Sequence, residues 1–166
     1  MRNITFIGMP SSGKSTIGVL LAKRLGMSFV DLDIVIQENT QKKLKDLIAE
    51  FGQEVFLDIE EETACEIDVS NSVIAPGGSI CHEQKAMEHL SDISTVVYLY
   101  ISYEEMERRV GDYVARGVAI PEGYTLRDLY DERSSLYEKY SDIKVDETGK
   151  HFDQIVDELL VILGGK

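Results

Sequence analysis

The chain has 166 residues, 43% of them hydrophobic and 28% charged, with a formal net charge of −13. This size and composition are typical of one globular domain, so we expect a single domain over residues 1–166. The acidic balance argues against a nucleic-acid-binding protein, because tracking a phosphate backbone requires a basic stripe and none is visible. No apolar run approaches the roughly 18 residues of a membrane span, and the first residues do not resemble a signal peptide.

The two cysteines, Cys65 and Cys81, have neither metal-type nor redox-type spacing. We interpret both as reduced thiols and expect a cytoplasmic monomer that acts on a small molecule, with no nucleic-acid or membrane partner. Much of the excess acid lies in runs such as "DIEEE" at 58–62. We interpret this run as a solvated helix face.

Short β-like runs alternate with helical patterns along the chain. This alternation predicts a three-layer α/β/α domain with a parallel sheet. Such sheets bind ligands beyond the carboxyl ends of their strands, where the glycine-rich turns of this chain fall. Strands are predicted at 3–8, 72–78, 95–102 and 143–146 and at the start of 28–33, and helices at 13–25, 34–39, 44–52, 54–68 and 152–163.

The first turn of the chain carries a phosphate-binding motif. Gly8, Gly13, Lys14 and Ser15 match G-x-x-x-x-G-K-[ST] between a strand and a helix, which is the context that gives the motif its meaning. Backbone N–H groups and the helix N-terminus would hold a nucleoside triphosphate such as ATP, with Lys14 on the β- and γ-phosphates and Ser15 on Mg²⁺. The alternative is a glycine-bearing turn that carries Lys and Ser by chance. The expected nucleotide-binding residues are Gly8, Ser11, Ser12, Gly13, Lys14, Ser15 and Thr16.

Two acids, Asp31 and Asp33, follow the second predicted strand. At the carboxyl end of a strand, one could orient Mg²⁺ while the other accepts a hydrogen bond from an attacking hydroxyl. The same spacing also fits a helix N-cap followed by an acid in the first turn. Sequence alone leaves both interpretations open.

Two later segments complete the candidate site. The glycine pair in "APGGS" at 75–79 is either a plain turn or a place where substrate lies against the backbone. Residues 110–124 are polar, contain glycines and a proline, and carry Arg116, so they form a candidate lid. Arginines on mobile segments often neutralise a transferring phosphate.

The order of "GMPSSGKSTIG", "FVDLDIVI", "FGQEVFLDIEEE", "SVIAPGGSI", "RRVGDYVARG" and "DERSSLYEKYSDIKVD" resembles shikimate kinase through nearly the whole chain. The resemblance implies a nucleoside-monophosphate-kinase-like fold with five central strands in the order 2-3-1-4-5. It also implies ATP as donor, Mg²⁺, a ring hydroxyl of shikimate as acceptor, and a place in aromatic amino acid biosynthesis.

The resemblance assigns roles position by position. Asp31 matches the acid near the metal, which Ser15 also binds. Asp33 matches the acid that binds the substrate hydroxyls and receives the proton, so Lys14, Asp33 and Arg116 are the implied catalytic residues. Gly77, Gly78 and Arg133 match substrate-binding residues, Arg109 matches an arginine that stacks on adenine, and Arg116 matches the lid arginine.

The chain departs from the family pattern in the acceptor half. Leu57 stands where the family has an arginine that pairs with the substrate carboxylate, a loss of roughly 2–5 kcal/mol if the group is buried. Ser79 ends the glycine triplet, and "RGVAIP" replaces the usual sequence after the lid arginine.

Three explanations follow from these departures. The chain phosphorylates shikimate through Arg133 and Arg116 alone, or it phosphorylates a different hydroxylated metabolite, or its acceptor site has decayed to an ATP-binding module. We favour a small-molecule kinase and prefer shikimate slightly. A GTPase is disfavoured because no N-K-x-D motif occurs.

Overall fold

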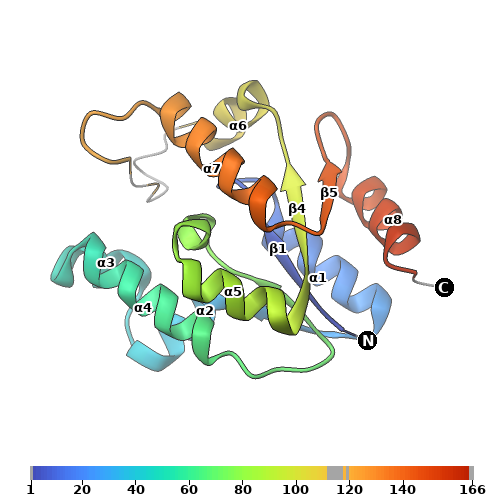
Figure 1. Ribbon diagram of the computed structural model, residues 1–166, viewed down its shortest axis with the longest axis horizontal. Helices are drawn as coiled ribbons and strands as arrows, with labels where there is room; N and C mark the ends of the chain where they lie inside the picture. The colour runs from blue at the N-terminus through green and yellow to red at the C-terminus, as the bar shows by residue number, and fades with distance from the viewer. Residues whose placement is uncertain (1, 112–117, 119, 165–166) are drawn as a thin grey trace.

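One parallel sheet organises the molecule, with its strands in the order β2-β3-β1-β4-β5 (Figure 1). The structure is a computed structural model that describes residues 2–111, 118 and 120–164. Its topology confirms the parallel five-stranded sheet and the 2-3-1-4-5 order. The strands are β1 (Asn3–Ile7), β2 (Ser28–Asp31), β3 (Ser72–Ala75), β4 (Ser94–Tyr100) and β5 (Ile143–Asp146).

Helices cover both faces of the sheet and form the predicted three layers. α1 and α8 pack on one face, whereas α5 and α7 pack on the other (Figure 1). α3 and α4 extend beyond the sheet on the side of β2. The helices are α1 (Lys14–Leu25), α2 (Leu32–Thr40), α3 (Leu44–Phe51), α4 (Gln53–Glu66), α5 (Gln84–Ile93), α6 (Tyr103–Val110), α7 (Leu126–Tyr140) and α8 (Phe152–Ile162), with a short 3-10 helix η1 (Gly78–His82).

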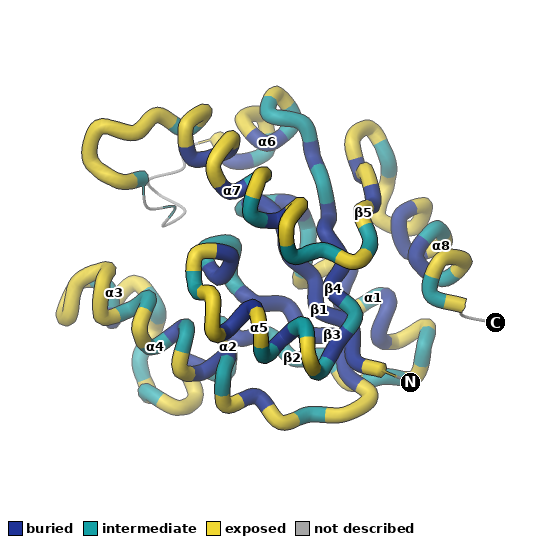
Figure 2. Tube along the Cα trace, viewed as in Figure 1, coloured by how far each residue is buried: buried dark blue, intermediate teal, exposed yellow. Residues whose placement is uncertain are grey.

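Two hydrophobic cores form because alternate residues of a strand point to opposite faces of the sheet. Phe6 and Leu99 lie in the core under α1 and α8, and Ile7 and Tyr98 lie in the core under α5 and α7. All four side chains are fully buried, which contributes about 1.5–3 kcal/mol each for side chains of this size. Figure 2 shows the buried strands at the centre of the molecule.

The strands end where the site begins. The strand predicted at 72–78 ends at Ala75, because Pro76 has no N–H for the ladder. β2 ends at Asp31, whose side chain caps α2. The shortened strands place the P-loop, the two acids and the glycine pair together at the carboxyl edge of the sheet.

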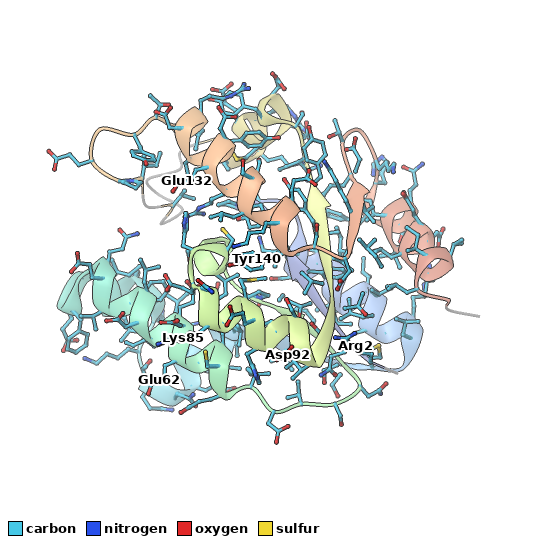
Figure 3. All side chains as sticks on the ribbon, in the orientation of Figure 1. Arg2, Glu62, Lys85, Asp92, Glu132 and Tyr140 are labelled. Atoms are coloured by element: carbon cyan, nitrogen blue, oxygen red, sulfur yellow. The ribbon has the colours of Figure 1, made fainter. Side chains whose placement is uncertain are left out.

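The amino terminus is anchored at the opposite edge. Arg2 donates hydrogen bonds to the carbonyls of Ser91 (2.6 Å) and Asp92 (3.2 Å) at the end of α5 (Figure 3). Within the described part of the chain, we find no helix whose length and apolar character would let it cross a bilayer.

Candidate active site

A cavity of about 750 Å³ opens at the carboxyl ends of β1, β2 and β3. The P-loop forms one end of it, and α3, α4 and α7 form the other. Most of the predicted site residues meet here. The lining includes Lys14, Ser15, Thr16, Asp31, Asp33, Lys45, Leu57, Glu60, Gly77, Gly78, Ser79, Val118 and Arg133.

The two motif glycines are required by close backbone packing in the P-loop. Gly8 has φ +154°, and a Cβ there would lie 2.6 Å from the carbonyl oxygen of Leu99. Gly13 has φ +80°, and its Cβ would lie 2.9 Å from the ring of Phe152. Neither position accepts a side chain without strain. The predicted turn therefore has the glycine-dependent geometry of an anion-binding loop.

Ser12 supports the loop from inside. Its N–H donates to the carbonyl of Met9 at 3.1 Å, and its buried hydroxyl lies against Gly8 without a hydrogen-bond partner. A contact between Ser12 and phosphate therefore stays a prediction.

The Lys14 ammonium is held within the loop that it would serve. Its Nζ donates to the carbonyls of Gly8 (2.8 Å) and Met9 (2.9 Å). The residue as a whole is half-buried, but the ammonium itself lies inside the loop. This burial lowers the pKa of Lys14 to about 8, against the opposing effect of Asp33. The lysine is thus positioned at the mouth of the anion cradle.

Asp31 caps a helix, as one of its two interpretations predicted, and it also contacts the P-loop. One carboxylate oxygen accepts from the N–H of Asp33 at 3.0 Å and caps α2. The other accepts from the Ser15 hydroxyl at 2.9 Å. Ser15 and Asp31 therefore present adjacent oxygen donors, the ligand type that Mg²⁺ prefers. In the described residues no group of three or more His, Cys, Asp or Glu side chains could hold a metal ion.

Asp33 occupies the position between the phosphate loop and the acceptor end. Burial raises its pKa, the neighbouring Asp31 raises it further, and Lys14 opposes both. A carboxylate with a raised pKa accepts a proton more readily. This environment suits a group that takes a proton from an attacking hydroxyl.

The glycine pair is pressed between α4 and α7. A Cβ on Gly77 would lie 2.1 Å from Oε1 of Glu60, and one on Gly78 would lie 3.3 Å from Nη1 of Arg133. The Tyr137 hydroxyl donates to the carbonyl of Gly78 at 2.5 Å. The turn is therefore fixed in place, and Tyr137, which sequence reasoning did not assign to the site, is one of its anchors.

Glu60 is a buried acid in the wall of the cavity, with only 1% of its surface exposed. The interpretation of 58–62 as a solvated face is wrong for this residue. Its Oε2 accepts a hydrogen bond from Ser79 at 2.5 Å. Burial raises the pKa of Glu60 to about 7, although Ser79 and Arg133 act in the opposite direction. The sequence of the acidic run at 58–62 does not indicate that Glu60 faces inward.

Arg133 is the buried cation of the acceptor end. It lies on α7, is 7% exposed, and lines the cavity. Its Nε has no hydrogen-bond partner, and no salt bridge joins the side chain to any residue that the structure describes. A buried guanidinium without a partner is costly unless a ligand supplies the anion.

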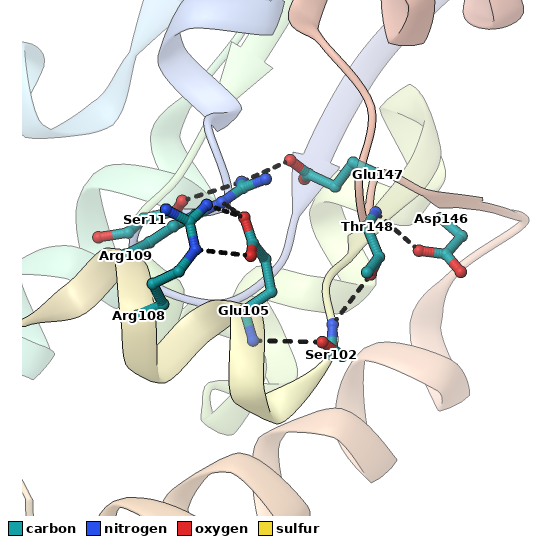
Figure 4. A network of polar contacts seen from close by, with 8 residues as sticks. All are labelled: Ser11, Ser102, Glu105, Arg108, Arg109, Asp146, Glu147 and Thr148. Carbon is teal, nitrogen blue, oxygen red and sulfur yellow. Dashed lines mark hydrogen bonds and ion pairs between the residues drawn. The ribbon is translucent and has the colours of Figure 1, made fainter.

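Arg109 lies on the far side of the P-loop in a network of its own (Figure 4). It pairs with Glu105 at 2.6 Å and with the fully buried Glu147 at 2.9 Å, and its Nη1 lies 3.5 Å from the carbonyl of Ser11. Burial raises the pKa of Glu147 to about 7, opposed by Arg109. The guanidinium is thus held beside the loop by two carboxylates.

A second cavity of about 420 Å³ adjoins this arginine. It is lined by Ser11, Gly13, Arg109, Lys150, His151 and Phe152. The exposed ring of Phe152 lies beside Gly13 and offers a flat apolar surface. The sequence predicted a helix from residue 152 but gave Phe152 no part in the site.

The structure describes only part of the predicted lid. Arg116 lies outside the described residues. Val118, which is described, lines the larger cavity.

The fold and the site together place the chain among the P-loop kinases. A glycine-dependent loop between β1 and α1 would hold phosphates, and two acids follow β2. A buried arginine lies at the opposite end of the same cavity.

Comparison with known proteins gives the family. Residues 10–163 match the family model for shikimate kinase. The shikimate kinase of Clostridium botulinum is 36% identical, and the match covers 98% of this chain and 98% of its own. That of Persephonella marina is 33% identical over 96% of this chain and 98% of its own. The chain belongs to the shikimate kinase family.

Solved structures agree with this family. Shikimate kinase from Acinetobacter baumannii in complex with shikimate matches with a TM-score of 0.87 at 29% identity, covering all of this chain and 95% of that one. Shikimate kinase from Aquifex aeolicus matches with a TM-score of 0.84 at 30% identity, covering 98% of this chain and 96% of that one. The APS kinase CysC of Mycobacterium tuberculosis, at 16% identity and a TM-score of 0.60, shares the fold alone.

Proposed function

We propose that this protein transfers the γ-phosphoryl group of ATP to a hydroxyl of shikimate. The observation that carries the acceptor assignment is Arg133, a buried guanidinium that lines the cavity and has an unpartnered Nε. Shikimate is a hydroxylated carboxylate, so its carboxylate would satisfy Arg133 while a hydroxyl points toward the P-loop. The shikimate bound to the related enzyme of Acinetobacter baumannii supports this choice.

The donor half would bind ATP with Mg²⁺. Backbone N–H groups of the loop Gly8–Ser15 and the N-terminus of α1 would hold the phosphates. Lys14 would exchange its two carbonyl partners for phosphate oxygens, and Ser15 with Asp31 would hold the metal. The ring of Phe152 and the guanidinium of Arg109 would contact the adenine in the smaller cavity.

The transfer step uses Asp33 and Lys14. The acceptor hydroxyl oxygen forms a bond to Pγ as the bond from Pγ to the β,γ-bridging oxygen breaks, and ADP leaves. Asp33 accepts the hydroxyl proton, and its raised pKa suits that role. Lys14 would stabilise the negative charge on the transferring group, and a metal held by Ser15 and Asp31 would supply further positive charge there. We propose that the segment 110–124, with Arg116, closes over the cavity and excludes water.

A second candidate function is phosphorylation of a neutral polyol. Leu57 favours it, because an alkyl side chain replaces the family arginine at the acceptor end. Arg133 argues against it, since a neutral acceptor would bring no anion to a buried guanidinium whose Nε has no hydrogen-bond partner among the described residues.

The proposal is tested by measuring ADP release in an assay coupled to a dehydrogenase. The protein is given ATP–Mg²⁺ together with shikimate, with a neutral polyol, or with no acceptor. Shikimate-dependent release in the native protein supports it. Asp33→Asn should abolish transfer while ATP binding stays near normal. Release with the polyol alone would establish the second candidate, and ATP binding with no release for any acceptor would mean that the acceptor site has decayed.

A further inference from the structure

The charged side chains of the large cavity suggest an additional substrate ligand. Among the described residues that line it, three are acidic and three are basic. Lys14 is held inside the P-loop by two carbonyls, so it belongs to the phosphate end. The acceptor end then has two cations. The charged lining residues are Lys14, Asp31, Asp33, Lys45, Glu60 and Arg133.

Lys45 is the second of these cations. It lies in the first turn of α3, is exposed, and lines the cavity beside Leu44 and Ile48. α3 packs against α4, the helix that carries Leu57 and Glu60.

This lysine has no partner within the described part of the chain, where no hydrogen bond or ion pair involves its ammonium. Its neighbour Lys42 is different, because it pairs with Glu50. The position is also electrostatically unfavourable, since the first turn of a helix favours acids rather than bases. α3 has no side-chain cap, and the acid in its first turn is the next residue, Asp46. A lysine that departs from this preference and forms no ion pair within the described residues points to a ligand.

A second positive charge beside Arg133 would favour binding of an anionic acceptor. It is the buried cation opposite α3, and Asp33 and Glu60 line the same end. A carboxylate that entered with Arg133 as its sole cation would face two acidic side chains, Asp33 and Glu60. A second cation at the cavity mouth would pair with its other oxygen and offset the repulsion.

We propose that Lys45 is a substrate-binding residue that pairs with the acceptor carboxylate opposite Arg133. It thereby takes the place of the arginine that is absent at Leu57. The inference rests on the proposed function, because it needs an acceptor with a carboxylate. Lysine suits the exposed side, where its flexible stem can follow the ligand, and arginine suits the buried side, where its planar group is fixed.

The test compares Lys45→Met, Lys45→Arg and the control Lys43→Met in steady-state kinetics. Lys43 is the exposed residue that precedes α3 and does not line the cavity. Lys45→Met should raise KM for shikimate about tenfold and leave kcat and KM for ATP within about twofold. Lys45→Arg should stay near the native values, and Lys43→Met should change nothing. Adding Leu57→Arg to Lys45→Met should restore shikimate binding, because a cation returns to the same end of the cavity.

Three results would overturn the inference. If the native protein turns over shikimate and Lys45→Met keeps the same KM, Lys45 is no ligand and the proposed function stands. If Lys45→Met and Lys43→Met raise KM equally, the effect is a general one of surface charge. Failure of the native protein to use shikimate, with ATP binding intact, would instead overturn the proposed function together with this inference.

Discussion

Glu60 and Ser79 form a hydrogen-bonded pair in the wall of the acceptor cavity, with the hydroxyl 2.5 Å from the carboxyl oxygen. They come from α4 and η1, which are separated along the chain by β3. In the sequence, Ser79 was noted only as the residue that ends the glycine triplet. The structure gives the Ser79 side chain a partner, because its hydroxyl donates to the buried carboxyl of Glu60.

This pair predicts a pH-dependent stability. Burial raises the pKa of Glu60 from 4.5 to about 7 in the folded protein. The folded state therefore binds the proton more tightly than the unfolded state, and folding loses stability as pH rises from about 4.5 to about 7. In Glu60→Gln, whose side chain is neutral at every pH, the free energy of unfolding should fall by on the order of 2–3 kcal/mol less over this pH range than in the native protein. Urea unfolding at about pH 5 and about pH 8 measures it.

Glu62→Gln is the matched control, because Glu62 is exposed on the same helix (Figure 3). It should leave the pH dependence of the native protein unchanged. Glu147 also has a pKa raised to about 7, so Glu60→Gln with Glu147→Gln should flatten the profile further. Identical profiles for the native protein and Glu60→Gln would contradict the assignment.

A second prediction concerns Gly77. A methyl group there would fall 2.1 Å from the Glu60 carboxyl, so Gly77→Ala forces that side chain or the turn to move. We expect a destabilisation of about 1–3 kcal/mol, as for other overpacked sites, and a higher KM for shikimate. Chemical denaturation and steady-state kinetics provide the two readouts.

Shortening the neighbour should relieve part of this clash. The double variant Gly77→Ala/Glu60→Ala should be destabilised by less than the sum of the two single-variant effects, because the shorter side chain at position 60 makes room for the methyl group at position 77. Strict additivity would mean that the close approach of Gly77 and Glu60 does not exist in solution.

A third prediction concerns the smaller cavity. Phe152→Ala removes an aromatic surface beside Gly13, and loss of stacking on adenine costs about 1–3 kcal/mol. KM for ATP should therefore rise roughly 5- to 100-fold, while KM for shikimate stays unchanged. Val161→Ala, an exposed apolar position near the other end of α8, is the control. Equal ATP kinetics for both variants would place adenine elsewhere.

The donor half could be predicted from the sequence because its chemistry is local. Gly8, Gly13 and Lys14 lie within one turn, and the conformations that they adopt follow from the motif itself. The sheet order came from the resemblance, and the structure confirms it. Asp31 was ambiguous because the same spacing fits a helix cap and a metal ligand; its carboxylate caps α2 and contacts Ser15, and the metal role stays a prediction.

The acceptor half could not be predicted in the same way, because it depends on which long side chains meet across the fold. Glu60 belongs to an acidic run whose other members face solvent or are half-buried. Lys45 and Arg133 are 88 residues apart in the numbering, and nothing local indicates that both line one cavity. Phe152 likewise reaches Gly13 only because α8 packs beside α1.

The most direct test of the central claim is the dependence of activity on Arg133 and on the acceptor's charge. Shikimate-dependent ADP release should be measured for the native protein and Arg133→Met, with Arg127→Met, an exposed arginine on the same helix, as control. We predict that Arg133→Met lowers kcat/KM for shikimate about 10²-fold or more, whereas Arg127→Met stays near native. Native-like use of shikimate by Arg133→Met, or a native protein that uses a neutral polyol and not shikimate, would contradict the account.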